Sequence, residues 1–177
     1  MTEPLALDAY AAELRRAFDA SFASAGVFEA EATIDLLGVV VAGEAFALRV
    51  ADVSAVVKPK KIVRVPSRRP ALLGLAGIRG NLCAVYGLAA LLGRPRGLSA
   101  PRWIAVARGS DTIALAFDEV FGFLRARASD LSAAAEGGAP HVSRIVRAGD
   151  TSRSIVDVSE IVLSLQSEAA PRGQPKE

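Results

Sequence analysis

FALRVADV at residues 46–53 has a counterpart 67 residues further along the chain, IALAFDEV at residues 113–120. Each stretch is typical of a strand, and each ends in an acidic residue followed by valine. A strand pattern that recurs at a fixed distance indicates an internal repeat of a β-rich unit. The sequence therefore favours paired small barrels or one double barrel.

A second correspondence extends this repeat. VYGL at residues 85–88 aligns with IVDV at residues 155–158, 70 residues later, and each precedes a short helical pattern. One longer loop in the second copy accounts for the larger offset. We therefore predict two related halves, at about 33–93 and 101–165, joined by the proline- and glycine-rich segment between them.

The first half reads as hairpins. Residues 34–50, IDLLGVVVAGEAFALRV, contain two apolar runs around Ala42-Gly43-Glu44, which predicts a hairpin with strands buried on both faces. GLAGIR at residues 74–79 and NLCAVY at residues 81–86 predict a second strand pair. GLAALLG follows as a short helix that ends at Gly93.

The ends of the chain differ from this body. Residues 1–30 predict a helical extension, because apolar side chains recur at helical spacing over residues 4–25. Residues 31–166 form one predicted domain, and the polar tail 167–177 is expected to be disordered. The sequence shows no signal peptide and no apolar run long enough to cross a membrane, and its one cysteine, Cys83, is expected to be buried. We expect a cytoplasmic protein.

The charge is distributed unevenly, although the net charge is only +2. Basic residues occur without any acid from residue 58 to residue 108, at Lys58, Lys60, Lys61, Arg64, Arg68, Arg69, Arg79, Arg94, Arg96, Arg102 and Arg108. This basic block predicts an acidic partner surface or an acidic neighbouring segment. Nucleic acid is the alternative partner, but the block has few aromatic residues and no nucleic-acid-binding motif.

The residues needed for catalysis are scarce. The one histidine, His141, has neither a second histidine nor a cysteine cluster at metal-ligand spacing. GxSxG, GxGxxG and GxxxxGK[ST] motifs do not occur. We therefore expect a binding protein rather than an enzyme, with no metal and no cofactor, and interpret His141 as a residue at the edge of a strand.

Several motifs occur in a fixed order along the chain. They are FALRVADV, a loop with three prolines, LLGLAGIRG, a strand leading to LLG, IALAFDEVFGF and IVDVSEIV. This order resembles the CheW family, the adaptor proteins of bacterial chemosensory arrays, and the resemblance covers residues 34–165.

The resemblance implies a mainly β fold of two SH3-like small β-barrel subdomains packed together, here with an N-terminal amphipathic helix and short helices after the barrels. It implies a non-catalytic adaptor that binds the regulatory domain of a CheA-type histidine kinase and the cytoplasmic tip of a chemoreceptor. The alternative is a small basic β-barrel that binds nucleic acid or a small anionic ligand.

Arg79 and Gly80 fall on the NLRG pattern of that family, but Gly77 stands where asparagine is common. Gly87 likewise replaces an aspartate that the second half retains as Asp157. The guanidinium of Arg79 suits a carboxylate or backbone carbonyls of a partner. The alternative is an internal ion pair of Arg79 with Asp52 or Asp118.

The surfaces that face the kinase and the receptor are expected to be mainly apolar, because a few aliphatic and aromatic anchors inside a charged rim provide most of the affinity of such interfaces. The candidates are Val56, Val57, Ile62, Val63 and Val65. From the sequence alone these five residues could equally belong to the core.

Overall fold

The computed structural model describes residues 32–59, 61–95, 100–110, 112–134, 138–148 and 151–169. The chain divides into two units, Met1–Ala32 and Thr33–Glu177, and every described helix and strand lies in the second unit. The helical extension expected at residues 1–30 lies outside the described residues.

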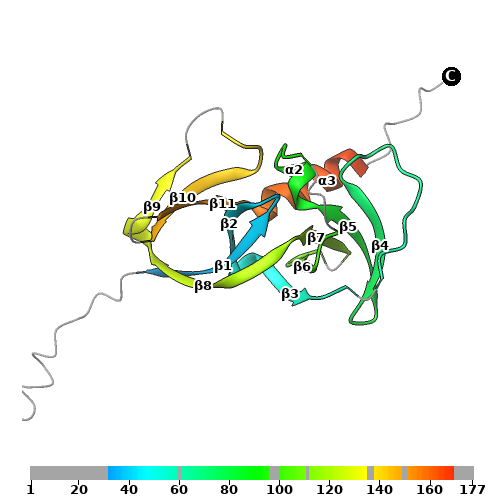
Figure 1. Ribbon diagram of the computed structural model, residues 1–177, viewed down its shortest axis with the longest axis horizontal. Helices are drawn as coiled ribbons and strands as arrows, with labels where there is room; N and C mark the ends of the chain where they lie inside the picture. The colour runs from blue at the N-terminus through cyan, green and yellow to red at the C-terminus, as the bar shows by residue number, and fades with distance from the viewer. Residues whose placement is uncertain are drawn as a thin grey trace, which may run out of the picture. The chain divides into compact units, whose positions relative to one another are not determined.

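Two β-sheets form the body of this unit (Figure 1). Sheet A has the strand order β8-β1-β2-β11-β10-β9, and sheet B has the order β3-β6-β7-β5-β4. The strands of sheet A are Thr33–Val41 (β1), Glu44–Arg49 (β2), Glu119–Arg127 (β8), Leu131–Ala133 (β9), Val142–Ala148 (β10) and Thr151–Val156 (β11). The strands of sheet B are Val53–Val57 (β3), Leu72–Ile78 (β4), Asn81–Gly87 (β5), Trp103–Ala107 (β6) and Ile113–Phe117 (β7). The prediction of a mainly β fold is confirmed.

The helical elements are few. They are the 3₁₀ turns Val50–Asp52 (η1) and Ala128–Asp130 (η2) and the α-helices Leu88–Leu91 (α2) and Val158–Ala169 (α3). The expectation of disorder from residue 167 is wrong for residues 167–169, which continue α3. The physical reason is that no proline or glycine interrupts the helix before Pro171. The rest of the tail lies outside the described residues.

Two-residue turns close both hairpins of the first half. Ala42 and Gly43 connect β1 to β2 with φ values of 52° and 84°, and Arg79 and Gly80 connect β4 to β5 with 49° and 85°. Positive φ at both central positions is the type I′ geometry, whose twist matches that of the flanking strands. Both predicted hairpins are therefore confirmed.

The internal repeat appears in the topology, although the two sheets are not the two sequence halves. Each sheet contains strands from both halves, and exchanging the halves converts β8-β1-β2-β11-β10 into β3-β6-β7-β5-β4. The register agrees with the sequence offsets. Phe46 pairs with Ser154 across parallel strands β2 and β11, and their repeat equivalents, Ile113 and Ala84, pair across β7 and β5.

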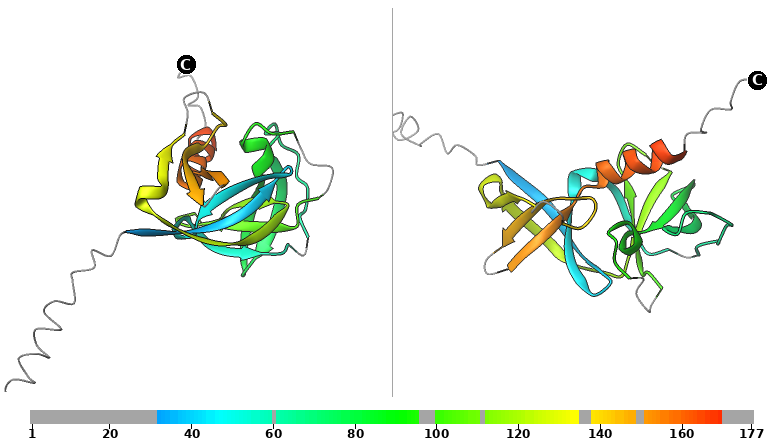
Figure 2. Two further views of the ribbon diagram at one scale, coloured as in Figure 1. Left: turned by 60° about the vertical axis from the view of Figure 1, so that its left-hand side comes forward. Right: turned by 90° about the horizontal axis from the view of Figure 1, so that it is seen from above.

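The largest core cluster joins the two sheets. It contains Leu48 of sheet A, Leu115 and Phe117 of sheet B, and Ile161 and Leu165 of α3, all at most 4% exposed. Figure 2 shows α3 running from the end of β11 toward sheet B. Burial of each such side chain contributes about 1.5–3 kcal/mol to folding, so α3 stabilises the contact between the sheets. Cys83 is buried as expected, in a second cluster within sheet B.

Candidate functional site

Five cations of the basic block contact other residues of the chain. These contacts are Lys58 over the Trp103 ring (4.9 Å to the centroid), Arg69 to the Leu165 carbonyl (3.3 Å), Arg94 to Glu44 (2.8 Å), Arg102 to Glu119 (3.5 Å) and Arg108 to the carbonyls of Ala51 (2.6 Å) and Val53 (3.0 Å). About half of the block therefore makes contacts within the fold. Glu44 and Glu119, the acids paired with Arg94 and Arg102, lie outside the block.

Four other cations of the block differ from these five. Lys61, Arg64, Arg68 and Arg79 are exposed, and among the described residues they have no ion-pair or hydrogen-bond partner. The first three lie on the segment that precedes β4, and the fourth lies at the tip of the β4–β5 hairpin. We call these four residues the cationic edge. Their side chains are available to bind an anionic group of a partner.

The segment before β4 is held against that strand. Val63 and Leu75 form an isolated antiparallel bridge with two backbone hydrogen bonds of 2.8 Å. Gly74 permits this approach, because its φ is 147° and a Cβ atom there would collide with the carbonyl of Val63. The antiparallel direction places Lys61 toward the Arg79 end of β4 and Arg64 toward the other end, so the cations are spread along the β4 edge of sheet B.

The apolar candidates are distributed over two environments. Val63 is 52% exposed, whereas Ile62 and Val65 are half-buried beside the same segment. Val56 and Val57 are half-buried on β3 and pack against the two core clusters, Val56 against the larger one. The structure thus places Ile62, Val63 and Val65 on the segment of the cationic edge, but Ile62 also packs against the second core cluster, as Val57 does. Val63 is the most exposed of the five candidates.

Among the described residues, Arg79 does not form the ion pair with Asp52 or Asp118 that was the alternative to a contact with a partner. Asp52 accepts a 2.9 Å hydrogen bond from Arg49 Nε, and Asp118 accepts one of 2.7 Å from the backbone of Ala42. The side chain of Leu82, opposite Gly77 on the neighbouring strand, is 64% exposed. The hairpin tip therefore presents an arginine and an apolar residue to solvent. Leu82 was missed because alternation alone did not show which face of β5 is covered.

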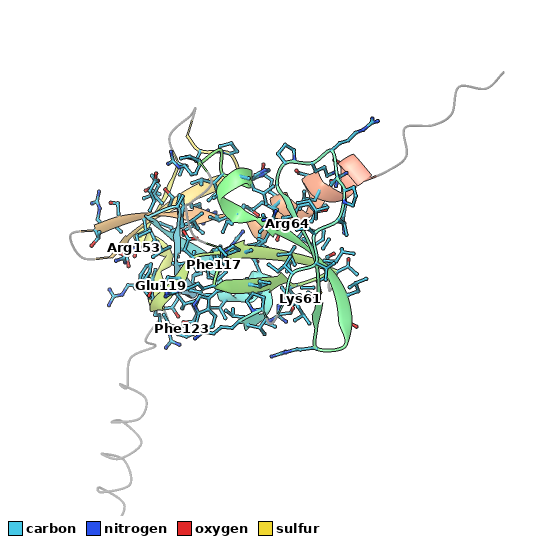
Figure 3. The ribbon with its side chains drawn as sticks, turned by 45° about the vertical axis from the view of Figure 1, so that its right-hand side comes forward. Lys61, Arg64, Phe117, Glu119, Phe123 and Arg153 are labelled. Atoms are coloured by element: carbon cyan, nitrogen blue, oxygen red, sulfur yellow. The ribbon has the colours of Figure 1, made fainter. Side chains whose placement is uncertain are left out.

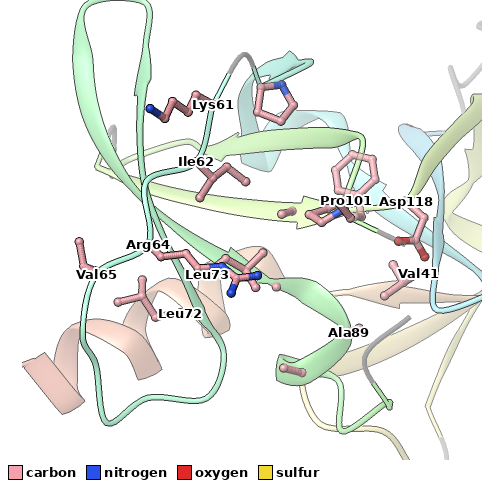
Figure 4. A pocket seen from close by; sticks show the side chains of 16 residues that line it. Val41, Lys61, Ile62, Arg64, Val65, Leu72, Leu73, Ala89, Pro101 and Asp118 are labelled. Atoms are coloured by element: carbon pink, nitrogen blue, oxygen red, sulfur yellow. The ribbon is translucent and has the colours of Figure 1, made fainter. Parts of the chain in front are cut away.

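A pocket of about 650 Å³ opens beside this edge (Figure 4). Its apolar walls include Leu72 and Leu73 of β4, Ala89 of α2 and Phe117 of β7. Lys61 and Arg64 also line it, and Figure 4 shows Arg64 reaching from its loop toward the pocket interior. The volume is within the usual range for ligand pockets, about 300–1,000 Å³. No motif in the sequence pointed to this pocket, because it is formed by segments that are distant in the chain.

Strand β8 of sheet A carries two exposed phenylalanines, Phe121 and Phe123, the second of which is labelled in Figure 3. Phe123 is 77% exposed, and the Phe121 ring lies over Gly38, where a Cβ atom would collide with it. The guanidinium of Arg153 lies 5.0 Å from the Phe121 ring centroid. The register shift between Gly38 and Val39 makes Phe121 a bulge residue, so its ring lies on the face of Gly38. Phe123 is paired with Leu37, whose side chain points to the opposite face of the sheet.

A charged pair joins β1 and β8 near these rings. Arg125 Nε donates to Asp35 Oδ1 at 2.7 Å, and both side chains are largely exposed. This hydrogen bond holds the pKa of Asp35 below its ordinary value and raises the pKa of Arg125. Both groups therefore remain charged at neutral pH.

His141 lies immediately before β10, as expected from the sequence. Its Nδ1 is 3.4 Å from Glu160 Oε1, and its backbone carbonyl accepts a 2.8 Å hydrogen bond from Asp157. In the part of the chain that the structure describes, no group of three His, Cys, Asp or Glu side chains could hold a metal ion, and no helix is long and apolar enough to cross a membrane.

The fold and its surface define a β-rich domain with a cationic edge and an adjoining pocket. Residues 35–166 match the family model of the CheW-like domain, and the chain belongs to this family. The fold is similar to the crystal structure of the scaffolding protein TtCheW from Thermoanaerobacter tengcongensis, with a TM-score of 0.64 and 21% sequence identity. The similarity covers 71% of this chain and 89% of that chain. No curated protein matches the sequence.

Proposed function

We propose that this protein is a non-catalytic coupling adaptor of a bacterial chemosensory array. It links the cytoplasmic tip of a chemoreceptor to the regulatory domain of a CheA-type histidine kinase, and it works in the cytoplasm, reaching the membrane only through receptors. Membership of the CheW-like domain family supports the class of function. The shared strand order of the two sheets supports an assignment of each as a small SH3-like barrel.

The observation that carries the proposal is the exposed cationic edge with Arg79 at its end. Arg79 and Gly80 form the tip of the β4–β5 hairpin, and Val63, which is bridged to Leu75 further along β4, supplies an exposed apolar contact on the same edge. Ile62 and Val65 extend this apolar surface, and Val56 and Val57 support it through their packing. The guanidinium is always charged, and its planar fork can form two hydrogen bonds to one carboxylate, so less side-chain freedom is lost per hydrogen bond than for lysine.

Calorimetric titration of the adaptor with a cognate kinase regulatory domain tests this proposal. We expect Arg79→Glu to weaken binding by tenfold or more, because charge reversal repels the partner carboxylate, while the melting temperature stays the same. Arg147→Glu on β10 is the matched control, since Arg147 is also exposed and the change in net charge is identical. Equal affinities of the Arg79→Glu variant and the wild type would contradict the assignment of Arg79.

The cationic edge also suggests a second candidate function, the binding of nucleic acid or a small anion. Proteins that bind single strands usually stack bases on exposed aromatic rings. Tyr86 is only 7% exposed, and Trp103 is half-buried beneath Lys58, so neither offers such a surface. The exposed rings of Phe121 and Phe123 lie on β8 of sheet A and not on the cationic edge, which belongs to sheet B. A salt-dependent mobility shift with an oligonucleotide, in the absence of binding to the kinase domain, would favour this second candidate.

A further inference from the structure

The repeat places two equivalent junctions in the molecule, and one of them is filled by charged side chains. There Arg49 at the end of β2 donates to Asp52 at 2.9 Å and to Asp157 at 3.3 Å. Asp157 also caps α3, accepting a 3.0 Å hydrogen bond from the backbone of Glu160. Glu160 in turn lies 3.4 Å from His141. We call these five residues the polar cluster.

The equivalent junction lies in sheet B, where four of the five positions carry small residues. Ala116 corresponds to Arg49, Gly87 to Asp157, Ala90 to Glu160 and Ala71 to His141. The backbone confirms the equivalence, because Gly87 donates to the carbonyl of Ala71 at 2.8 Å just as Asp157 donates to that of His141. Gly87 and Ala116 are also paired in the β5–β7 register.

The pocket occupies this junction. Gly87, Ala90 and Ala116 all line it, so the small residues leave open the space that side chains fill at the other junction. The backbone does not require glycine at position 87. Its φ is −75°, and a Cβ atom there would make only ordinary contacts with Leu73, at 3.5 Å or more. The space is open because of side-chain size and not because of backbone geometry.

The charges around the pocket are mostly positive. Lys61 and Arg64 have no described partner, and the one lining carboxylate, Asp118, accepts a hydrogen bond from the backbone of Ala42. Leucine, alanine and phenylalanine side chains form the walls. The pocket therefore combines an apolar interior with cations that an incoming carboxylate would satisfy.

We propose that this pocket binds a segment of a partner protein in which an apolar side chain stands next to a carboxylate. The apolar side chain enters the space between Gly87, Ala116 and Leu73, and the carboxylate contacts Arg64 and Lys61. This proposal extends the proposed adaptor function by assigning the chemistry of one docking segment. It is tested with peptides and without a kinase, so its failure is distinguishable from failure of the adaptor function.

The probe is acetyl-Glu-Leu-Glu-Phe-amide, titrated into the full-length ¹⁵N-labelled chain and followed by NMR. We expect shifts centred on the amides of Gly87, Ala89 and Ala116. The neutral acetyl-Gln-Leu-Gln-Phe-amide should bind at least tenfold more weakly, because it cannot satisfy the cations. Arg64→Glu should reduce affinity at least tenfold, whereas Arg68→Glu, on the same segment but outside the pocket, should leave it unchanged.

The double variant Gly87→Asp with Ala116→Arg tests the origin of the pocket. It introduces at this junction the pair that Arg49 and Asp157 form at the other, so it should fold, fill the pocket and bind the acidic peptide at least tenfold more weakly. If that variant is unfolded, Ala89→Leu provides the same test, because Ala89 lines the pocket from the half-buried face of α2.

Three results would overturn the proposal. One is the absence of shifts at these amides at about 10 mM peptide, which lies beyond any affinity useful for docking. The second is equal binding of the acidic and neutral peptides. The third is equal binding of N-acetylglutamate alone, which would make the occupant a free small anion rather than a segment of a partner protein.

Discussion

At the residue scale, Arg79 has a left-handed backbone conformation, with a φ of 49°, that arginine disfavours. The left-handed region costs a residue other than glycine about 1–2 kcal/mol, and asparagine or glycine is favoured at this place in a type I′ turn. Arg79 makes no described contact that would offset this cost. The stability of the hairpin therefore does not explain why arginine, rather than asparagine or glycine, stands at this position.

At position 74, the backbone conformation and the close approach of Val63 leave room only for glycine. Replacing it with alanine should lower the free energy of unfolding by about 1–3 kcal/mol, because the φ of 147° and the carbonyl of Val63 both exclude a side chain. Chemical denaturation followed by circular dichroism measures this change. Gly77→Ala on the same strand is the control, since nothing lies within 4 Å of its Cβ position. Equal stabilities of the two variants would contradict this explanation of Gly74.

At the element scale, the sequence offsets of 67 and 70 residues predicted which strands are equivalent, and the pairing of Phe46 with Ser154 and of Ile113 with Ala84 agrees with both. Both hairpins of the first half and the end of α2 before Gly93 also followed from local signals. These features depend on residues close together in the chain, which is why the sequence revealed them.

Other features depended on packing between distant elements. The length of α3, the exposure of Phe123 and the use of half of the basic block inside the fold are set by neighbours that a local pattern does not include. The pocket is the clearest case. The pocket is open because two small residues, Gly87 on β5 and Ala116 on β7, are paired at its wall. The sequence showed only that glycine stands at position 87 in place of an acid.

Substitutions at the two equivalent junctions should have different effects on the free energy of unfolding. Asp157→Ala should lower the free energy of unfolding by about 0.5–2 kcal/mol, because it removes the cap of α3 and the contact with Arg49. Gly87→Ala at the equivalent position should leave stability the same or raise it by about 0.4–1 kcal/mol, since alanine restricts the unfolded chain. Thermal or urea unfolding of both variants measures the difference. Greater destabilisation by Gly87→Ala would contradict the interpretation of the two junctions.

At the scale of the whole molecule, the two halves of the chain are interlocked. Sheet A takes β1 and β2 from the first half and the rest of its strands from the second, and sheet B takes β6 and β7 from the second half. Neither half can complete a sheet alone, and the largest core cluster includes residues of both. Such an arrangement favours cooperative, two-state unfolding of the body.

Dividing the chain within residues 96–99 tests this interlocking. Each fragment alone should be unfolded by NMR and circular dichroism, because its strands lack their partners, and mixing the two should restore the folded spectrum. The uncut chain under the same conditions is the control. A fragment that folds alone would show that the halves are independent domains, contrary to the strand order.

The central claim is that the protein couples a receptor to a kinase, and a ternary capture experiment tests it most directly. Receptor cytoplasmic tips are immobilised, and retention of the cognate CheA-type kinase is measured with and without the adaptor. The account predicts that the kinase is retained only when the wild-type adaptor is present and that Arg79→Glu reduces retention at least tenfold. Retention of the kinase without the adaptor, or no retention in the presence of the folded adaptor, would contradict the account.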